Sequence, residues 1–203
     1  MSKNSIFLKK GLEKELKFEP KGLEFFLDLQ DMEEHHKNTI RMILRQAKLL
    51  PSGLREFHGN YTGGLYDHIL LVTNYAHHIY ENSIIKNLDH AKVVLTSLYH
   101  DFGKISYYGL KRKLPNAKVK TKLRDKKRAH QKNTSSFNLK GKDNHVDDCI
   151  CVLDVYKLPY DEEMHRAIIF HHGSYSYYEP YVPNRLATLV HTADMIAVRI
   201  HKV

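Results

Sequence analysis

Apolar side chains recur at intervals of three or four residues over most of the chain, which is the spacing of α-helices that bury one face. Segment 88–102 is apolar on most of its surface, so we expect it to lie at the centre of the fold. Alternating strand-like runs of convincing length and internal repeats are both absent. The pattern predicts an all-α fold, with helices at residues 23–50 (two helices), 63–80, 88–102, 144–156, 161–171 and 183–202.

Residues that start and stop helices agree with these boundaries. Asp161 precedes two acidic residues, which is typical of an N-cap followed by carboxylates that favour a helix N-terminus. Asn144 is a second candidate N-cap, and Pro183 suits the first turn of the last helix. The Pro-Ser-Gly segment at 51–53 is expected to end the N-terminal helical region.

The predicted organisation is an N-terminal helical extension over 1–48 and a second unit over 49–203. Within the second unit, residues from about 110 to 142 lack sustained apolar periodicity, so we expect a long loop there. This segment, called the basic insert below, holds thirteen Lys or Arg against one acid, whereas the whole chain has a net charge of +9. The rest of the protein is therefore mildly acidic.

The basic insert has two interpretations. It could hold the phosphates of RNA or single-stranded DNA, because Lys and Arg bind phosphate groups irrespective of base sequence. It could equally be a solvated run of charge that improves solubility. The sequence leaves both open.

Composition excludes several classes of protein. With 203 residues, of which 42% are hydrophobic and 27% charged, the chain can bury a core and is neither largely disordered nor collagen-like. No apolar run reaches the roughly 18–20 residues of a membrane span, and the N-terminus lacks the features of a secretory signal. Cys149 and Cys151 are too few for a disulfide framework and are expected to be small buried residues. These features predict a cytoplasmic protein with no membrane partner.

Histidine is unusually frequent, with 15 residues. His100-Asp101 ends the most apolar predicted helix, and Asp194 lies within an apolar stretch, where an acid without a partner is costly to bury. A shared metal ion would satisfy both sites, and imidazole with carboxylate suits Mn, Fe, Co, Ni or Zn. His58 and His191 could contact such a site. The other histidines outside the motifs are expected at the surface, namely His35, His36, His77, His78, His90, His130, His165 and His201.

The order of His68, His100-Asp101 and Asp194 resembles the HD-domain metal-dependent phosphohydrolases, an all-helical superfamily, over roughly 49–200. Within that superfamily the likeness is to the HD domain of bacterial three-prime exoribonucleases, in the segments NYTGGLYDH, LYHDFGK, NHVDD and IIFHHGSY with VPNRLATLVHTADMIA. The resemblance implies an HD-domain helical bundle, with the basic insert as a long loop, and two divalent metals. The first would be held by His68, His100, Asp101 and Asp194, and the second by Asp101 as a bridge together with His145, His171 and His172.

The same resemblance implies a hydrolase, of the nuclease type, that cleaves a phosphodiester of a nucleotide or nucleic acid. Its metal would be one such as manganese. A hydroxide on the metals would attack phosphorus in line, with Asp101 at the catalytic centre. Lys104 would contact phosphate oxygens, with Arg185 as a second candidate, although Lys104 could instead cap a helix C-terminus. Tyr175 and its neighbouring tyrosines could line a substrate pocket or pack a loop.

Two other functions stay open at this point. The first is a phosphomonoesterase that acts on free nucleotides. The second is a non-catalytic nucleic-acid-binding protein in which the metal is a structural staple.

Overall fold

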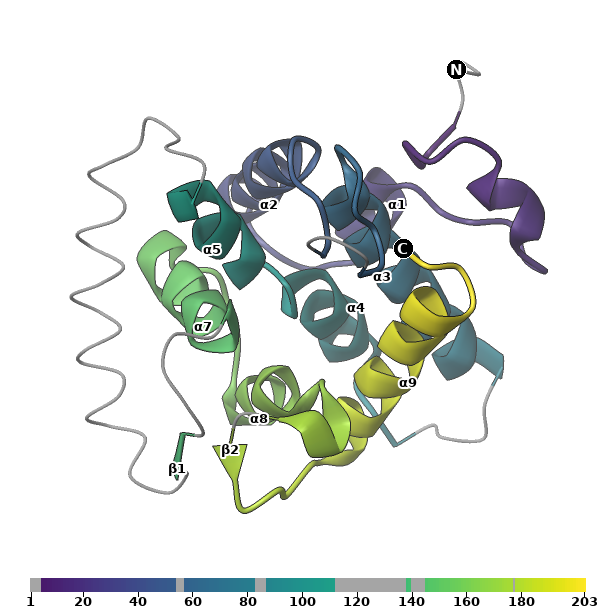
Figure 1. Cartoon of the computed structure of the whole chain (residues 1–203). Coiled ribbons are helices and arrows are strands. Elements are labelled where there is room, and N and C mark those ends of the chain that lie inside the picture. The colour runs from purple at the N-terminus through teal and green to yellow at the C-terminus, as the bar shows by residue number, and fades with distance from the viewer. Residues whose placement is uncertain (1–4, 54–56, 83–86, 112–137, 140–144, 177) are drawn as a thin grey trace.

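The computed structural model describes residues 5–53, 57–82, 87–111, 138–139, 145–176 and 178–203, and statements about structure refer to these residues. Helices make up most of them, so the predicted all-α fold is confirmed (Figure 1). The elements in chain order are η1 (Leu12–Glu15), α1 (Leu23–Asp28), α2 (Glu34–Ala47), α3 (Gly64–Asn82), α4 (His90–Tyr99), α5 (Gly103–Lys111), β1 (Asn138–Leu139), α7 (His145–Tyr156), α8 (Glu162–Phe170), η2 (Gly173–Tyr175), β2 (Tyr178–Glu179) and α9 (Arg185–Arg199).

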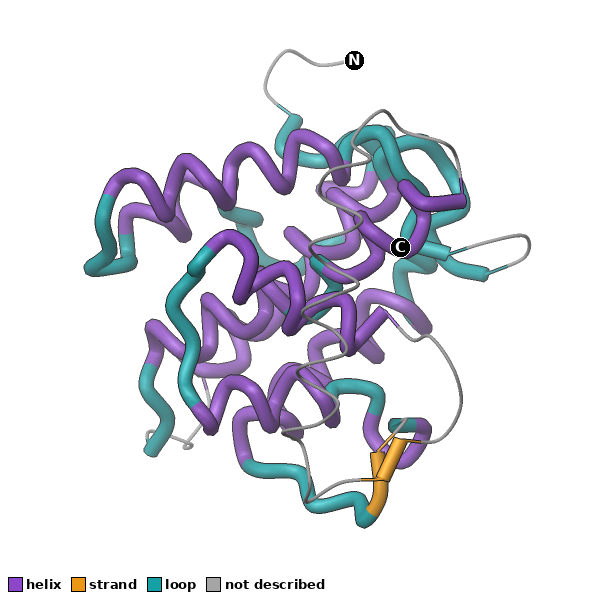
Figure 2. The backbone as a smooth tube through the Cα atoms, turned by 90° about the vertical axis from the view of Figure 1, so that its left-hand side faces the viewer, coloured by secondary structure: helices purple, strands orange, loops and turns teal. Residues whose placement is uncertain are grey.

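The helix α4 lies in the middle of the bundle, as the apolar pattern predicts. Figure 1 shows α3 and α9 on one side of α4, and α5, α7 and α8 on the other. The closest packing is between α3 and α9, α3 and α4, α5 and α7, and α8 and α9. All seven residues from Val93 to Tyr99 are buried, because helices surround α4 on every side. The tube in Figure 2 shows the same crowding of helices from another direction.

The N-terminal residues belong to the same hydrophobic core as the rest of the chain. Helix α2 buries Ile40, Ile43, Leu44 and Ala47, which form one stripe at helical spacing. Phe7, Leu12 of η1, and Phe26 and Leu27 of α1 join the same cluster. The boundary between 1–48 and 49–203 stays a prediction about organisation, since the core continues across it.

Two polar side chains of α3 hold this N-terminal segment in place. The carboxylate of Asp67 accepts hydrogen bonds from the backbone N–H groups of Leu8 and Lys9, each at 2.7 Å, and from the Tyr61 hydroxyl at 2.7 Å. Further along α3, the Asn74 amide bonds both the N–H and the carbonyl of Lys21. Because these partly buried backbone groups are paired, the irregular segment before α1 packs on α3 with these hydrogen bonds satisfied.

Most predicted helix boundaries agree with the structure to within a few residues. Asp161 is the N-cap of α8, and its side chain accepts from the Met164 N–H. Helix α9 begins at Arg185 rather than Pro183, because the side chain of Asn184 caps it by accepting from Ala187 N–H. The candidate cap Asn144 lies outside the described residues.

The prediction of one helix over 88–102 is wrong at its C-terminal end. Helix α4 stops at Tyr99, the turn after it holds His100 and Asp101, and α5 begins at Gly103. A Cβ atom at Gly103 would lie 1.7 Å from the carbonyl oxygen of His145, so only glycine lets α5 start against α7. The turn therefore brings the His-Asp pair and the start of α7 together.

The strand content is limited to β1 and β2 within the described ranges. They pair antiparallel, with Asn138 opposite Glu179 and Leu139 opposite Tyr178. Nearly all of the basic insert lies outside the described residues, so its predicted loop structure stays a prediction. None of the helices in the described part of the chain combines the length and apolar character needed to cross a bilayer.

A candidate metal centre

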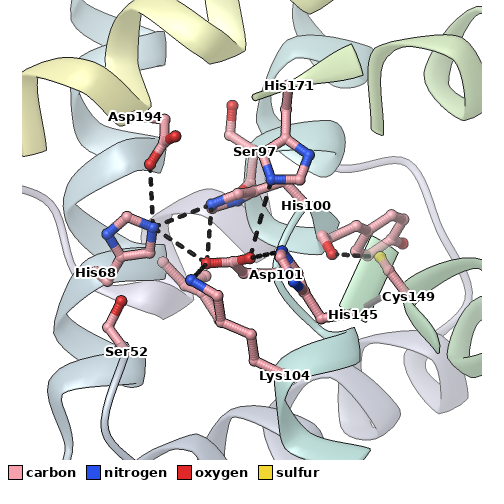
Figure 3. Close-up of polar contacts among 12 residues, drawn as sticks. Ser52, His68, Ser97, His100, Asp101, Lys104, His145, Cys149, His171 and Asp194 are labelled. Atoms are coloured by element: carbon pink, nitrogen blue, oxygen red, sulfur yellow. Dashed lines mark hydrogen bonds and ion pairs between the residues drawn. The ribbon is translucent and has the colours of Figure 1, made fainter. Parts of the chain in front are cut away.

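Seven side chains predicted as metal ligands meet at one buried point inside the bundle. Helix α3 supplies His68, the turn between α4 and α5 supplies His100 and Asp101, and α9 supplies Asp194. The first residue of α7 is His145, and His171 and His172 directly follow α8. Figure 3 shows His68, His100, His145 and His171 around the carboxylate of Asp101, with Asp194 beside His68.

The first part of this centre, called the carboxylate half, gathers on Oδ2 of Asp101. Nε2 of His68 lies 3.2 Å from this oxygen and 3.2 Å from Oδ1 of Asp194. Nε2 of His100 lies 3.5 Å from the same Asp101 oxygen and 3.3 Å from Nε2 of His68. Two carboxylates and two imidazoles therefore converge on a space in which every side chain is at most 5% exposed.

The second part, called the imidazole half, gathers on the other oxygen, Oδ1, of Asp101. Nε2 of His145 lies 3.4 Å and Nε2 of His171 lies 4.0 Å from it. Nε2 of His172 lies 2.9 Å from Nε2 of His145. Ligand atoms of His145, His171 and His172 all fall within 4.8 Å of one another, as do those of His68, His100 and Asp101. The two oxygens of Asp101 thus face two separate groups that could each hold a metal ion.

Backbone carbonyls orient three of the imidazoles. Nδ1 of His100 bonds the Ser97 carbonyl at 2.7 Å, and Nδ1 of His171 bonds the Ile168 carbonyl at 2.6 Å. Nδ1 of His68 bonds the carbonyl oxygen of Val203 at 2.9 Å. Because a carbonyl only accepts, Nδ1 must carry the proton in each ring, which leaves Nε2 as the atom that faces the centre. This arrangement is typical of metal-binding histidines.

Two atoms in the centre are left without a hydrogen-bond donor within the described part of the chain. These are Oδ1 of Asp101 and Nε2 of His171, both fully buried. With Nδ1 of His171 protonated, both atoms present lone pairs, and they face each other across 4.0 Å. Buried acceptors without a partner are costly, whereas a cation between them would satisfy both. The donor set therefore fits a divalent metal ion.

Charge is balanced without a metal mainly by His68 and Lys104. Burial lowers the pKa of His68, but hydrogen bonds with Asp101 and Asp194 outweigh it and raise the value to about 9. Burial opposes ionisation of Asp101, but the Lys104 ammonium and the histidines hold its pKa well below the ordinary value. Hydrogen bonding and charge from His68 likewise lower the pKa of Asp194 despite its burial. Without a metal, the imidazolium of His68 and the ammonium of Lys104 thus balance the negative charge of the two carboxylates, which a bound cation would otherwise do.

The other imidazoles are neutral at physiological pH. Burial lowers the pKa of His100 to about 4 and that of His145 to about 3. Burial also lowers the pKa of His171 and His172, and neighbouring histidines add to the effect at His172. A metal binds the neutral imidazole, so these four rings are already in the form that a metal requires.

Lys104 lies in the first turn of α5, so the alternative that it caps a helix C-terminus is wrong. Its Nζ is 2.7 Å from Oδ2 of Asp101, and the side chain is 9% exposed. Attraction to Asp101 outweighs the desolvation of the ammonium, so the pKa of Lys104 is raised and the side chain stays charged. The charge reaches the carboxylate half because α5 starts two residues after the His-Asp pair, which places Lys104 three residues after Asp101.

The predicted substrate contacts outside this centre are not brought into it. Tyr175 is 82% exposed in η2, and Arg185 is exposed in the first turn of α9. Arg185 precedes Asp194 by nine residues, which places it about 14 Å away along the helix axis. Their roles in substrate binding stay predictions. Cys149 and Cys151 are buried as expected, and Cys149 donates to the carbonyl of Tyr99 rather than to the centre.

Three histidines outside the ligand set support it. His191 bonds the carbonyl of His171 through Nδ1 at 2.7 Å, and the His58 ring lies 5.4 Å from that of His68. His201 was predicted at the surface, and this is wrong, because only 4% of it is exposed. It bonds the hydroxyl of Tyr75 at 2.6 Å and the carboxylate of Glu15 at 3.0 Å. The sequence around these three histidines gives no clear signal that would predict these contacts.

Comparison with known proteins adds no relative. Neither the protein-family models, nor the curated proteins, nor the solved structures include a significant match to this chain. The assignment of function therefore depends on the arrangement of the residues in the centre.

Proposed function

We propose that this chain is a metal-dependent phosphohydrolase of the HD-domain type that hydrolyses a phosphodiester of a nucleotide or nucleic acid. The observation that carries the proposal is the position of Asp101. Each of its carboxylate oxygens faces a different set of imidazoles, and the buried ammonium of Lys104 contacts Oδ2, one of these two oxygens. A structural staple needs one closed set of four ligands, whereas this centre offers seven ligand residues and a lysine.

The proposed cofactor is a pair of divalent ions. His68, His100, Asp194 and Oδ2 of Asp101 would hold one, and the imidazole half with Oδ1 of Asp101 would hold the other. Nitrogen and carboxylate ligands without thiolate favour Mn, Fe, Co, Ni or Zn over Mg and Ca. Bound there, the metals would acidify a water molecule and polarise the phosphate.

The chain's own residues would have three tasks. Asp101 would be a ligand shared by both ions. Backbone carbonyls hold the imidazoles of His68, His100 and His171 so that Nε2 needs no reorientation when a ligand arrives. Lys104 supplies a preorganised positive charge that would bind a non-bridging phosphate oxygen and offset the charge that develops in the transition state.

The proposed partner is RNA or single-stranded DNA, and the sequence of the basic insert supports it. The remainder of the chain is mildly acidic and offers no comparable concentration of positive charge. A substrate with several phosphates would gain affinity from the insert, and this gain would fall as the salt concentration rises. A free mononucleotide would gain much less.

A substrate panel with Mn²⁺ tests the proposal. We expect the purified protein to hydrolyse bis-p-nitrophenyl phosphate and short RNA, and Asp101→Ala to lower kcat/KM by at least about a thousandfold because both ion positions lose their shared ligand. Asp28→Ala, at an exposed aspartate of α1, is the matched control and should retain full activity.

Three results would contradict the proposal in different ways. Activity that survives Asp101→Ala would exclude this centre as the catalytic site. Release of inorganic phosphate from nucleoside monophosphates, with RNA left intact, would indicate a phosphomonoesterase. RNA binding without turnover, unchanged by Asp101→Ala, would indicate a non-catalytic nucleic-acid-binding protein.

A further inference from the structure

A second group of metal-ligating side chains lies outside the centre, where α3 ends and α4 begins. His77 and Glu81 are four residues apart on α3, so they share one face of its last turns. His90 is the first residue of α4. Nδ1 of His77 lies 2.9 Å from Nε2 of His90, and an oxygen of Glu81 lies 3.9 Å from the same His90 nitrogen. The three ligand atoms all fall within 4.8 Å of one another.

Aromatic rings hold both imidazoles in place. The ring of Tyr80 stacks on that of His90 with centroids 4.6 Å apart and planes 8° from parallel. Phe25 and Phe26 of α1 contact the His77 ring edge to face at 5.6 and 5.7 Å. Contacts of this kind restrict the rotation of the rings, so less conformational entropy is lost when a metal binds.

The protonation state also suits a metal. Partial burial and the neighbouring His90 lower the pKa of His77, so its ring is neutral near pH 7. The other titratable groups near this ring include Glu81, His78 and Lys21. A neutral imidazole can bind a cation without first releasing a proton.

We propose that His77, Glu81 and His90 form a second divalent-metal site, suited to zinc-class ions and open to solvent at a remaining coordination position. Two imidazoles and one carboxylate form a donor set for Zn²⁺, Co²⁺ or Ni²⁺ rather than for Mg²⁺ or Ca²⁺, which prefer oxygen ligands. The Glu81 side chain is 50% exposed and that of His90 is 27% exposed, so ions exchange with solvent directly.

An ion at this site would cross-link two helices that serve the central site. Helix α3 carries His68, and α4 leads into the turn that holds His100 and Asp101. Binding would therefore fix the end of α3 against the start of α4. Metal binding here does not depend on the proposed hydrolase activity.

Zinc binding to metal-stripped protein tests this inference. The bound ions are counted by equilibrium dialysis and elemental analysis in wild type, His90→Ala and Glu81→Gln. We expect His90→Ala to bind one ion fewer, and Glu81→Gln to bind that ion at least about tenfold more weakly, because each loses one of three ligands. His78→Ala, which removes an exposed histidine of the same helix turn, is the matched control and should bind as wild type does.

The same measurement in an Asp101→Ala background separates the two metal sites. In Asp101→Ala, we expect one zinc ion to remain bound and to raise the melting temperature. Adding His90→Ala to this variant should abolish that binding. If His90→Ala leaves the stoichiometry and affinity unchanged while Asp101→Ala lowers them, this inference is wrong and the central site stands. If circular dichroism shows that His90→Ala misfolds, the test depends on Glu81→Gln. Zinc affinity of Glu81→Gln equal to that of the wild type would then overturn the proposal.

Discussion

The two halves of the candidate metal centre share Asp101 but differ in charge and exposure. The carboxylate half adds a second acid, Asp194, and all of its side chains are at most 5% exposed. The imidazole half adds three neutral rings, and the side chain of His145 is 12% exposed. A divalent cation gains more from a buried position beside two carboxylates than from one beside a single shared carboxylate. If both halves hold ions as proposed, the carboxylate half would bind its ion more tightly, and the imidazole half would be the more exchangeable position.

Lys104 also distinguishes the two halves, because its ammonium contacts Oδ2 of Asp101, which belongs to the carboxylate half. We expect Lys104→Met, which keeps the length of the side chain but removes its charge, to lower kcat about 100- to 1,000-fold with little change in bound metal. Steady-state kinetics with elemental analysis measure both quantities, and Lys104→Arg should recover part of the rate. Unchanged kcat in Lys104→Met would show that the lysine only balances the charge of Asp101.

Removing one ligand from each half compares them directly. We expect Asp194→Asn to weaken the tighter metal-binding step about 100-fold, because it removes a negative charge from a buried position. His172→Gln should weaken only the looser step, about tenfold, because the ring is neutral and one of three. Isothermal titration with Mn²⁺ resolves the two steps. Equal losses in both variants would contradict the proposed order of affinity.

Much of the fold could be predicted from the sequence because helical periodicity is a local signal. The central position of α4 followed from its mostly apolar surface, and the start of α8 followed from Asp161. The break between α4 and α5 could not be predicted in this way. It depends on the close approach of Gly103 to His145, which is 42 residues away in sequence. The periodicity of one helix contains no information about such a contact.

From the residues alone, His100-Asp101 and Asp194 could be predicted to share a site, since an acid without a partner is costly to bury. The other candidate ligands followed only from the resemblance to the HD-domain phosphohydrolases. The groups that position those ligands could not be predicted. Val203 acts through its backbone carbonyl, which any residue would offer, and His201 looks like a polar residue at the chain's end. The cluster of His77, Glu81 and His90 was missed for a similar reason. Its residues lie on two helices whose packing sets their spacing.

The support behind His68 provides a smaller test of the carboxylate half. His201 anchors the segment that ends at Val203 by bonding Tyr75 and Glu15, and the Val203 carbonyl bonds Nδ1 of His68. We expect His201→Ala to loosen this carbonyl and to weaken the tighter metal-binding step up to about tenfold, which is a typical effect for a group behind a ligand. The looser step should not change, because His171 of the imidazole half bonds a different carbonyl, that of Ile168. Weakening of both steps alike in the titration would indicate a general loss of stability instead.

His68 and the neutral histidines of the centre should also impose opposite pH dependences on the stability of the metal-free protein. Between pH 6.5 and about 9 the folded chain holds a proton on His68 that the unfolded chain releases, so this stabilisation is complete below pH 6.5 and is lost as the pH rises through about 9. His145 behaves in the reverse sense, because its folded pKa is about 3. Its contribution is present above pH 6.5 and is lost as the pH falls toward 3, and His100, with a pKa of about 4, adds to this loss.

Urea unfolding at pH 5, 6.5 and 8.5 measures this balance, and we expect the metal-free protein to be most stable near pH 6.5. Asp194→Asn should remove part of the decline toward pH 8.5, because the raised pKa of His68 depends on that carboxylate. The decline toward pH 5 should persist in this variant, since burial of His145 and His100 causes it. Bound Mn²⁺ should also abolish the alkaline decline, because the ion displaces the proton from His68. An alkaline decline that is the same in wild type and Asp194→Asn would show that another group controls it, and the charge difference between the two halves would then have no effect on stability.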